Sequence, residues 1–239
     1  MTTKVEIDGM QVGDILKIKA SDPGFYEDVK AWTKTTKNEL LELTKDCGLV
    51  YATIQKGQNT MGNNTPKVAN IPSPEKENLV YESKDAKTMI VFSGDLDKAI
   101  ASFIIANGAA AMGKKVTMFF TFWGLNILRK SEQVPIKKNF IEKAFGMMMP
   151  RGSKKLGLSR MNMGGMGAKM IRGVMKDKNI LSLEDLIKAA IDSGVNIVAC
   201  TMSMDVMGIR EEELIDGVNY GGVGYYLGEA EEANVNLFI

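Results

Sequence analysis

The sequence contains no histidine and only two cysteines in 239 residues. Without histidine the chain has neither a Ser-His-Asp nor a Cys-His catalytic arrangement, and it has no imidazole to bind a metal ion. The two cysteines, Cys47 and Cys200, lie far apart and are too few for a disulfide framework. Covalent chemistry must therefore use a thiol, a carboxylate, a lysine, a tyrosine or a cofactor.

The chain also lacks an excess of charge of either sign, with 30 Lys and Arg against 29 Asp and Glu. Whole-molecule electrostatics therefore gives no reason to expect binding to nucleic acid or to an anionic membrane. The opening residues lack the apolar core of a signal peptide. The most apolar stretch, 100–122, is interrupted by Asn107, Gly113 and Lys114, which excludes a spanning helix. We expect a soluble, cytoplasmic protein without a transmembrane segment.

A segment rich in Asn, Pro and charged residues separates two parts of the chain. It spans residues 57–86, contains three of the six prolines and shows no sustained periodicity. Such a composition is typical of an extended tether. We therefore expect a first domain at residues 1–56, a linker at 57–86 and a second domain at 87–239.

The first part has the pattern of a small α+β unit. Alternating apolar residues predict a strand at 13–20, and the Asp-Pro-Gly that follows suits the start of a helix. Two further strands, 39–45 and 49–56, are expected to form a hairpin with Cys47 in its turn. That position makes Cys47 a replaceable turn residue rather than a partner thiol.

Strands and helices alternate in the second part. The strands are expected at 88–94, 114–122, 194–200 and 234–239, and the helices at 96–111, 182–193, 211–216 and 222–233. The first helix is expected to bury one face, formed by Leu96, Ala99, Ile100, Phe103, Ile104 and Ala111. Ser182 and Asp185 form a capping box at the start of the second. This alternation predicts an α/β fold with a parallel sheet covered on both faces.

Cys200 ends the predicted strand 194–200. Open parallel sheets place their ligand crevices at the carboxyl ends of their strands. The residues that follow, TMSMDVMGI, predict a short helical turn whose amides face the thiol and favour the thiolate. Thiolate is the form that attacks a disulfide or persulfide sulfur. The position alone fits an inert, buried small hydrophobe equally well.

The segment 147–175 is unusually long and rich in Met and Gly. Segments of this length between helices are often functional. An adaptable lid over Cys200, a docking surface for several partners and a copper(I) site are three interpretations, and a partly helical core segment in which Met fills gaps is a fourth. The glycines of this segment match no nucleotide-binding pattern. The turn at 93–95 fits a helix cap better than an anion site. We expect no bound cofactor and no metal.

The stretch GDILKIKASDPGFYEDVKAWTKTTKNELLEL resembles the later two-thirds of a TusA-type sulfur carrier, over Val12 to Lys56. That family carries sulfur on the cysteine of a Cys-Pro-x-Pro motif at the start of its first helix. The motif is absent here, and Cys47 does not correspond to it. The family's first strand and helix are absent as well. We therefore expect a partial TusA-like domain that either borrows cover from another subunit or from the second domain, or is loosely ordered. The alternative is that the chain is a fragment of a longer protein whose missing part carries the Cys-Pro-x-Pro thiol.

The remainder resembles the DsrE/DsrF-like superfamily, in the branch often labelled peroxiredoxin family. The resemblance rests on IVFSGDLDKAIASFIIANGAAAMG, TFWGLNILRK, the Met-Gly segment and ACTMSMDVMGI. It implies a flavodoxin-like three-layer fold, a homo-oligomer and transfer of sulfane sulfur through a persulfide on Cys200. It also implies partners among other sulfur-carrier or rhodanese-type proteins.

Our leading hypothesis is therefore a sulfur-relay protein or sulfurtransferase with Cys200 as the catalytic residue. Backbone amides at Thr201, Met202 and Ser203 are expected to stabilise the anionic sulfur. The methionines after Cys200, including Met204, are expected to form an apolar wall, and Asp205 to cap the helix or steer a proton. One alternative is a non-catalytic scaffold that docks partners through its Met-rich surface. Another is a thiol-dependent reductase with a bound nucleotide.

Overall fold

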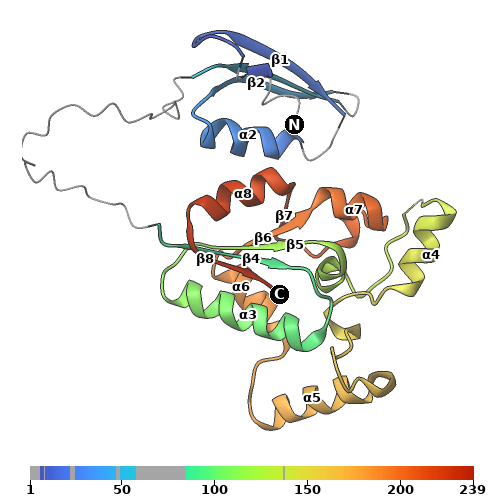
Figure 1. The fold of residues 1–239 in the computed structure, drawn as a ribbon. Helices are drawn as coiled ribbons and strands as arrows, with labels where there is room; N and C mark the ends of the chain where they lie inside the picture. The colour runs from blue at the N-terminus through green and yellow to red at the C-terminus, as the bar shows by residue number, and fades with distance from the viewer. Residues whose placement is uncertain (1–5, 8, 22–24, 47–48, 58–83, 137) are drawn as a thin grey trace, which may run out of the picture.

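The computed structural model describes residues 6–7, 9–21, 25–46, 49–57, 84–136 and 138–239, and it contains two separate sheets (Figure 1). The described residues up to 57 form the N-terminal unit, and those from 84 onward form the C-terminal unit. The antiparallel strands of the small sheet, in the order β1-β3-β2, are β1 (Ile15–Ala20), β2 (Glu39–Asp46) and β3 (Leu49–Gln55). All three strands were predicted. The predicted turn at Cys47 and helix start at Asp22 lie outside the described residues.

Helix α2 (Phe25–Thr35) covers one face of the small sheet (Figure 1). The central strand β3 turns alternate side chains, among them Ala52 and Ile54, toward the helix. These meet Val29 of α2 and Ile7, and all four side chains are at most 2% exposed. This period-2 alternation is what a strand with one covered face requires.

The large sheet consists of five parallel strands in the order β7-β6-β5-β4-β8. They are β4 (Ala86–Val91), β5 (Val116–Phe120), β6 (Asn196–Cys200), β7 (Val218–Gly221) and β8 (Ala233–Phe238). Successive residues of the inner strands are buried on opposite faces. The main core, on one face, includes Met118 and Ile197, whereas Phe119 and Val198 face the other way. Burial on both faces explains why these strands read as continuous apolar runs.

Helices cover the two faces unequally (Figure 1). Helices α3 (Leu96–Ala111) and α6 (Leu183–Asp192) pack on the main core, and α8 (Val223–Glu231) covers the opposite face. The resulting three-layer arrangement confirms the predicted α/β fold class. The Ser182 hydroxyl accepts a hydrogen bond from the Asp185 amide at 3.2 Å, which confirms the predicted start of α6. No helix within the described residues is long and apolar enough to cross a membrane.

The predicted buried face of α3 was partly wrong. Ile104 is 49% exposed and Ala111 is also exposed, whereas Ser102 and Ala106 are fully buried. The buried line passes through small side chains because these let α3 lie close to α6 and the sheet. Apolarity alone therefore did not identify the face.

Several short elements were not predicted as such. These are η1 (Phe122–Leu128), α4 (Phe140–Met148), η2 (Ser153–Lys155), η3 (Met163–Gly165), α5 (Met166–Asp177) and β7. Helix α7 (Thr201–Met207) was predicted as a short helical turn, and α5 lies in the segment for which a partly helical core was one interpretation. The helix expected at 211–216 is a single 3-10 turn, η4 (Glu211–Glu213). Strand β7 is only four residues long and lies at the sheet edge, so no apolar run marks it in the sequence.

A buried carboxylate joins the loops at one end of the C-terminal unit. Glu213 is 1% exposed and forms ion pairs with Arg129, Arg151 and Lys138. The Arg129 and Arg151 guanidinium nitrogens lie 3.2 and 3.0 Å from Glu213 Oε1, and the Arg210 amide donates to Oε2 at 3.0 Å. Three segments distant in sequence are thereby fixed to η4.

Burial, the largest single influence, acts to raise the pKa of Glu213. Hydrogen bonds from Lys138 and from the Arg210 amide, with the charges of Lys138 and Arg129, outweigh it and lower this pKa from 4.5 to about 2. A carboxyl whose pKa is lower in the folded chain stabilises that chain at neutral pH and ceases to do so in acid.

We expect Glu213→Gln to lower the free energy of unfolding at neutral pH by about 3 kcal/mol, because it leaves the buried Arg129 and two half-buried cations without their carboxylate. The stabilisation by Glu213 is complete above about pH 5 and is lost as the pH falls from there toward 2. Urea unfolding of wild type and variant across this range measures both effects. The variant should lose less stability in acid than the wild type does.

Glu212→Gln is the matched control. Its side chain is exposed, it forms no ion pair with the described residues, and the charge removed is the same. Parallel pH profiles for Glu213→Gln and wild type would contradict the assignment of this acid sensitivity to Glu213.

Candidate functional site

Cys200 is the last residue of β6, and the helix α7 begins at the next residue. Strand β6 is an inner strand of the large sheet, and Cys200 pairs there with Gly221 of β7. Its backbone is extended, with φ −72° and ψ 111°, before the chain becomes helical at Thr201. The predicted position at the carboxyl end of a parallel strand is therefore confirmed.

The thiol of Cys200 is buried in a small apolar cluster on the α8 face of the sheet. Cys200 is unpaired and only 3% exposed. The other side chains of this cluster, which we call the thiol cluster, are Ile90, Phe119, Val198, Tyr225 and Tyr226. The rings of Phe119 and Tyr226 lie 5.3 Å apart between centroids, which closes one side of the cluster. Solvent does not reach the thiol in this conformation.

Two hydroxyls follow Cys200 in α7. Ser203 is fully buried and shares a 2.7 Å hydrogen bond with Thr121, so it anchors α7 to the segment after β5. Thr201 Oγ1 is buried and has no partner within the described part of the chain. The Cys200 side chain makes no capping hydrogen bond with α7. The sulfur therefore lies beside the first turn of α7 without accepting a hydrogen bond from it.

The other residues predicted to support the site point elsewhere. Met202 is 54% exposed, and Asp205 is exposed as well. Met204 and Met207 are buried in the main core, on the face opposite the thiol cluster. The apolar wall expected from these methionines is provided instead by β4, β5 and α8.

The Met-rich segment 147–175 does not cover Cys200. Four of its apolar side chains, Met149, Leu156, Ala168 and Met175, are buried, and the first three join the main core on the other side of the sheet. Its exposed methionines are Met147, Met148, Met161, Met163, Met166 and Met170. In Figure 1, α5 lies beyond α3 and α6, away from α8. The segment is therefore not a lid on the thiol.

Helix α8 is the cover of the thiol cluster. None of its residues, all of which the structure describes, is fully buried. It is fixed to the sheet by the Tyr225 hydroxyl, which accepts from Asn196 Nδ2 at 2.8 Å, and by Glu229, which accepts from the Thr117 hydroxyl at 2.9 Å. A displacement of this helix would uncover the α8 side of the thiol cluster.

The N-terminal unit caps this cover. Helix α2 packs against α8, and Asp28 Oδ1 accepts hydrogen bonds from the amides of Gly222 and Tyr225, each at 3.1 Å. A carboxylate at a helix N-terminus satisfies free amides and complements the helix dipole. A Cβ on residue 222 would lie 2.4 Å from Asp28 Oδ2, so the contact requires glycine there.

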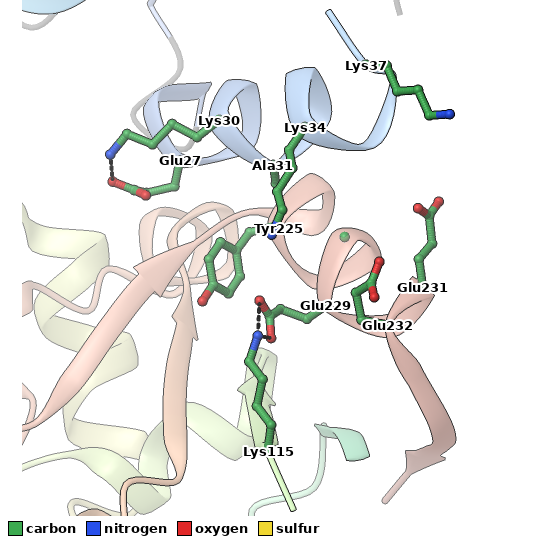
Figure 2. A pocket seen from close by; sticks show the side chains of 11 residues that line it. Glu27, Lys30, Ala31, Lys34, Lys37, Lys115, Tyr225, Glu229, Glu231 and Glu232 are labelled. Atoms are coloured by element: carbon green, nitrogen blue, oxygen red, sulfur yellow. Dashed lines mark hydrogen bonds and ion pairs between the residues drawn. The ribbon is translucent and has the colours of Figure 1, made fainter. Parts of the chain in front are cut away.

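A pocket of about 480 Å³ lies between α2 and α8. Figure 2 shows Glu27 and Lys30 from α2 on one side and Glu229 paired with Lys115 on the other. Its charged lining residues are Glu27, Lys30, Lys34, Lys37, Lys115, Glu229, Glu231 and Glu232, so the two signs balance. Tyr225 belongs both to this pocket and to the thiol cluster. The pocket therefore adjoins the thiol across a single side chain.

No group of three or more His, Cys, Asp or Glu side chains suited to a metal ion occurs among the described residues. Cys47 lies outside them. The described chemistry of the site is that of one thiol and two tyrosines beneath a single helix.

The sequence of residues 84–238 matches the model of the DsrE/DsrF/DrsH-like family, and the chain belongs to this family. Residues 1–56 match the model of the sulfurtransferase TusA. Both resemblances recognised in the sequence are therefore confirmed.

Two curated relatives match the C-terminal part. The chain is 58% identical over 158 residues to the uncharacterized protein YrkE of Bacillus subtilis. This match covers 66% of this chain and 99% of that protein. It is 37% identical over 158 residues to the sulfur carrier protein DsrE2 of Allochromatium vinosum. This match covers 63% of this chain and 96% of that protein. Among solved structures, the ychN protein from E. coli matches with a TM-score of 0.38 and 12% identity, covering 64% of this chain and 99% of that one.

Sequence reasoning missed the residues that enclose the thiol from α8 and α2. The helix at 222–233 was predicted, but its tyrosines were not assigned to the site. The sequence held part of the information needed to assign these tyrosines. A helix that follows a parallel strand returns across the sheet, so the helix at 222–233 could be expected to cover one of its faces. Asp28 gave no signal, since its contact with Gly222 joins residues 194 positions apart.

We expect Asp28→Ala to increase the rate at which an alkylating reagent modifies Cys200. Loss of a capping carboxylate costs about 1 kcal/mol, which corresponds to a roughly fivefold larger population of the open state. Mass spectrometry of time points with iodoacetamide, in a Cys47→Ser background, measures the rate. Gly222→Ala should have the same effect because its methyl displaces the carboxylate.

Glu27→Gln is the matched control, since Glu27 lies on the same helix and pairs with Lys30 at 3.0 Å. It should alkylate at the wild-type rate. Equal rates for Asp28→Ala, Gly222→Ala and wild type would show that α2 does not restrain the cover.

Proposed function

We propose that this chain is a sulfur-relay protein that carries sulfane sulfur as a persulfide on Cys200. In loading, the Cys200 thiolate attacks the outer sulfur of a donor persulfide, the donor S–S bond breaks, and the donor leaves as a thiolate. In unloading, an acceptor thiolate attacks the outer sulfur and Cys200 leaves as a thiolate. Each step replaces one S–S bond by another, so neither step needs an oxidant or a reductant.

The observation that carries the proposal is the position of Cys200, at the carboxyl end of an inner parallel strand and beneath a single helix. Membership of the DsrE/DsrF/DrsH-like family and the sulfur-carrier names of relatives support it. So does the putative sulfur carrier protein YrkI of Bacillus subtilis, 36% identical over 55 residues and covering 23% of this chain and 73% of that protein.

Burial of Cys200 favours storage of a bound persulfide but hinders its transfer to a partner. The thiol cluster would keep water and small oxidants away from a bound persulfide while the chain travels between partners. Transfer requires the same sulfur to meet a partner thiol, which the closed cluster prevents. We therefore propose that α8 opens when a donor or acceptor docks.

We propose that residues 1–56 are a TusA-like domain, 57–86 a linker and 87–239 the sulfur-carrying domain. The first domain lacks the Cys-Pro-x-Pro thiol, so we assign it the control of α8 rather than the transport of sulfur. The proposed partners are other sulfur-carrier or rhodanese-type proteins, in the cytoplasm, where thiols stay reduced. The proposed assembly is a homo-oligomer.

A scaffold without a reactive thiol is the second candidate function. It is favoured by the 3% exposure of Cys200, which an inert core cysteine also shows, and by the exposed methionines on α4 and α5. In that case the Met-rich surface docks sulfur-transfer proteins and Cys200 only packs.

We expect wild-type protein to gain the mass of one or more sulfur atoms on incubation with polysulfide or with a persulfidated rhodanese. Cys200→Ser should gain none, because it lacks the attacking sulfur. Cys47→Ser should load as the wild type does, since the sequence predicts only a replaceable turn residue at this position. Intact-mass spectrometry under non-reducing conditions measures all three.

Dithiothreitol treatment after loading is the control, and it should remove the added mass. If wild type gains no mass with either donor, the scaffold function is favoured and the relay mechanism is wrong. If Cys47→Ser gained as little sulfur mass as Cys200→Ser, the result would instead indicate a relay between the two thiols.

A further inference from the structure

A second pocket, distant from the thiol cluster, lies beside the buried carboxylate of Glu213. Its volume is about 320 Å³. It is lined by the loop 133–136, by Lys138 and Arg151, and by the side of α4 that carries Glu142, Lys143 and Gly146. We call it the Lys143 pocket. Neither Cys200 nor α8 contributes to it.

Positive charge exceeds negative charge around this pocket. The charged groups that line it or pair with its lining are Arg129, Lys138, Lys143, Arg151 and Arg210 against Glu142 and Glu213. Five cations and two carboxylates leave an excess of three positive charges. Guanidinium and ammonium groups that outnumber the carboxylates around a pocket favour the uptake of an anion.

The partners of each cation show which charges are already neutralised. Arg210 pairs with Glu142 at 2.8 Å, so that carboxylate is occupied. Arg129, Lys138 and Arg151 share the single carboxylate of Glu213. Arg129 is 1% exposed, and its Nε has no hydrogen-bond partner among the described residues. Lys143 is exposed and has no ion pair in the described part of the chain.

The wall of the pocket is thin where Arg129 lies behind it. A Cβ on Gly146 would lie 4.0 Å from Arg129 Nη2, and nothing else lies closer. Because residue 146 has no side chain, the field of this guanidinium reaches the pocket. Guanidinium and ammonium donors together are the groups that bind tetrahedral oxyanions in proteins.

We propose that the Lys143 pocket binds a free inorganic oxyanion of charge minus two, such as sulfate or thiosulfate, between Lys143, Lys138 and Arg151. The bound dianion neutralises most of the excess charge left by Glu213 and Glu142. It occupies a position separate from the proposed sulfur-carrying thiol, so this site does not depend on the persulfide mechanism.

Lys138 connects the pocket to the helix that follows Cys200. Its Nζ donates to the carbonyl oxygen of Gly208 at 2.6 Å, and Gly208 is the residue that ends α7. A bound anion draws on the same ammonium group that holds this carbonyl. The amide of Gly208 is therefore a reporter for occupancy, together with that of Gly146.

The test is a titration of the full chain with sodium sulfate, followed by backbone amide NMR shifts. We expect saturable shifts at Gly146 and Gly208, which sodium chloride at equal ionic strength does not reproduce. Lys143→Gln should raise the dissociation constant for sulfate about fivefold, because one charged donor is lost. Gly146→Leu should abolish the shift at Gly208 by filling the pocket, and leucine favours the helix that contains it.

Lys188→Gln is the matched control, because it removes an exposed lysine on α6 outside the pocket. It should bind sulfate as the wild type does. The proposal is overturned if sulfate and chloride give the same shifts, or if Gly146→Leu and Lys143→Gln bind like wild type. Tighter binding of phosphoserine than of sulfate overturns the assignment to a free inorganic ion.

Discussion

Strand β6 is buried on both faces, and the alternation of its side chains decides how the site is built. Ile197 and Ala199 pack into the main core beneath α3 and α6, while Val198 and Cys200 face α8. The parallel pairing with β5 and β7 fixes this register, and a slip by one residue would move the thiol into the main core. Cys200 therefore lies in the thinner of the two layers, where one helix separates it from the surroundings.

That helix depends on the N-terminal unit. Asp28 satisfies two amides at the start of α8, and Gly222 is the residue that lets the carboxylate approach. A unit that resembles a sulfur carrier without its cysteine thus contacts the cover of the only described thiol. Contact of this kind couples the docking of one unit to the accessibility of a site in the other, because both share the same hydrogen bonds.

The helix after Cys200 is fixed at both ends by different kinds of interaction. At its start the Ser203 hydroxyl bonds to Thr121, and at its end Lys138 donates to the Gly208 carbonyl while pairing with Glu213. The buried charge cluster therefore supports the chain near the thiol without contacting it. Its single carboxylate serves three cations, which explains both the lowered pKa of Glu213 and the excess charge of the neighbouring pocket.

The sequence by itself determined the strands, the main helices, both family resemblances and the position of Cys200 at a strand end. These follow from local periodicity and from contiguous motifs, which act within a few residues of the chain. It did not identify the buried face of α3, the edge strand β7, or the enclosure of the thiol by Tyr225 and Tyr226. It also assigned the wall to methionines that lie in the other core. Only the tertiary structure decided these features, because they depend on which residues distant in sequence are brought into contact, as Asp28 is with Gly222 and Arg129 with Glu213.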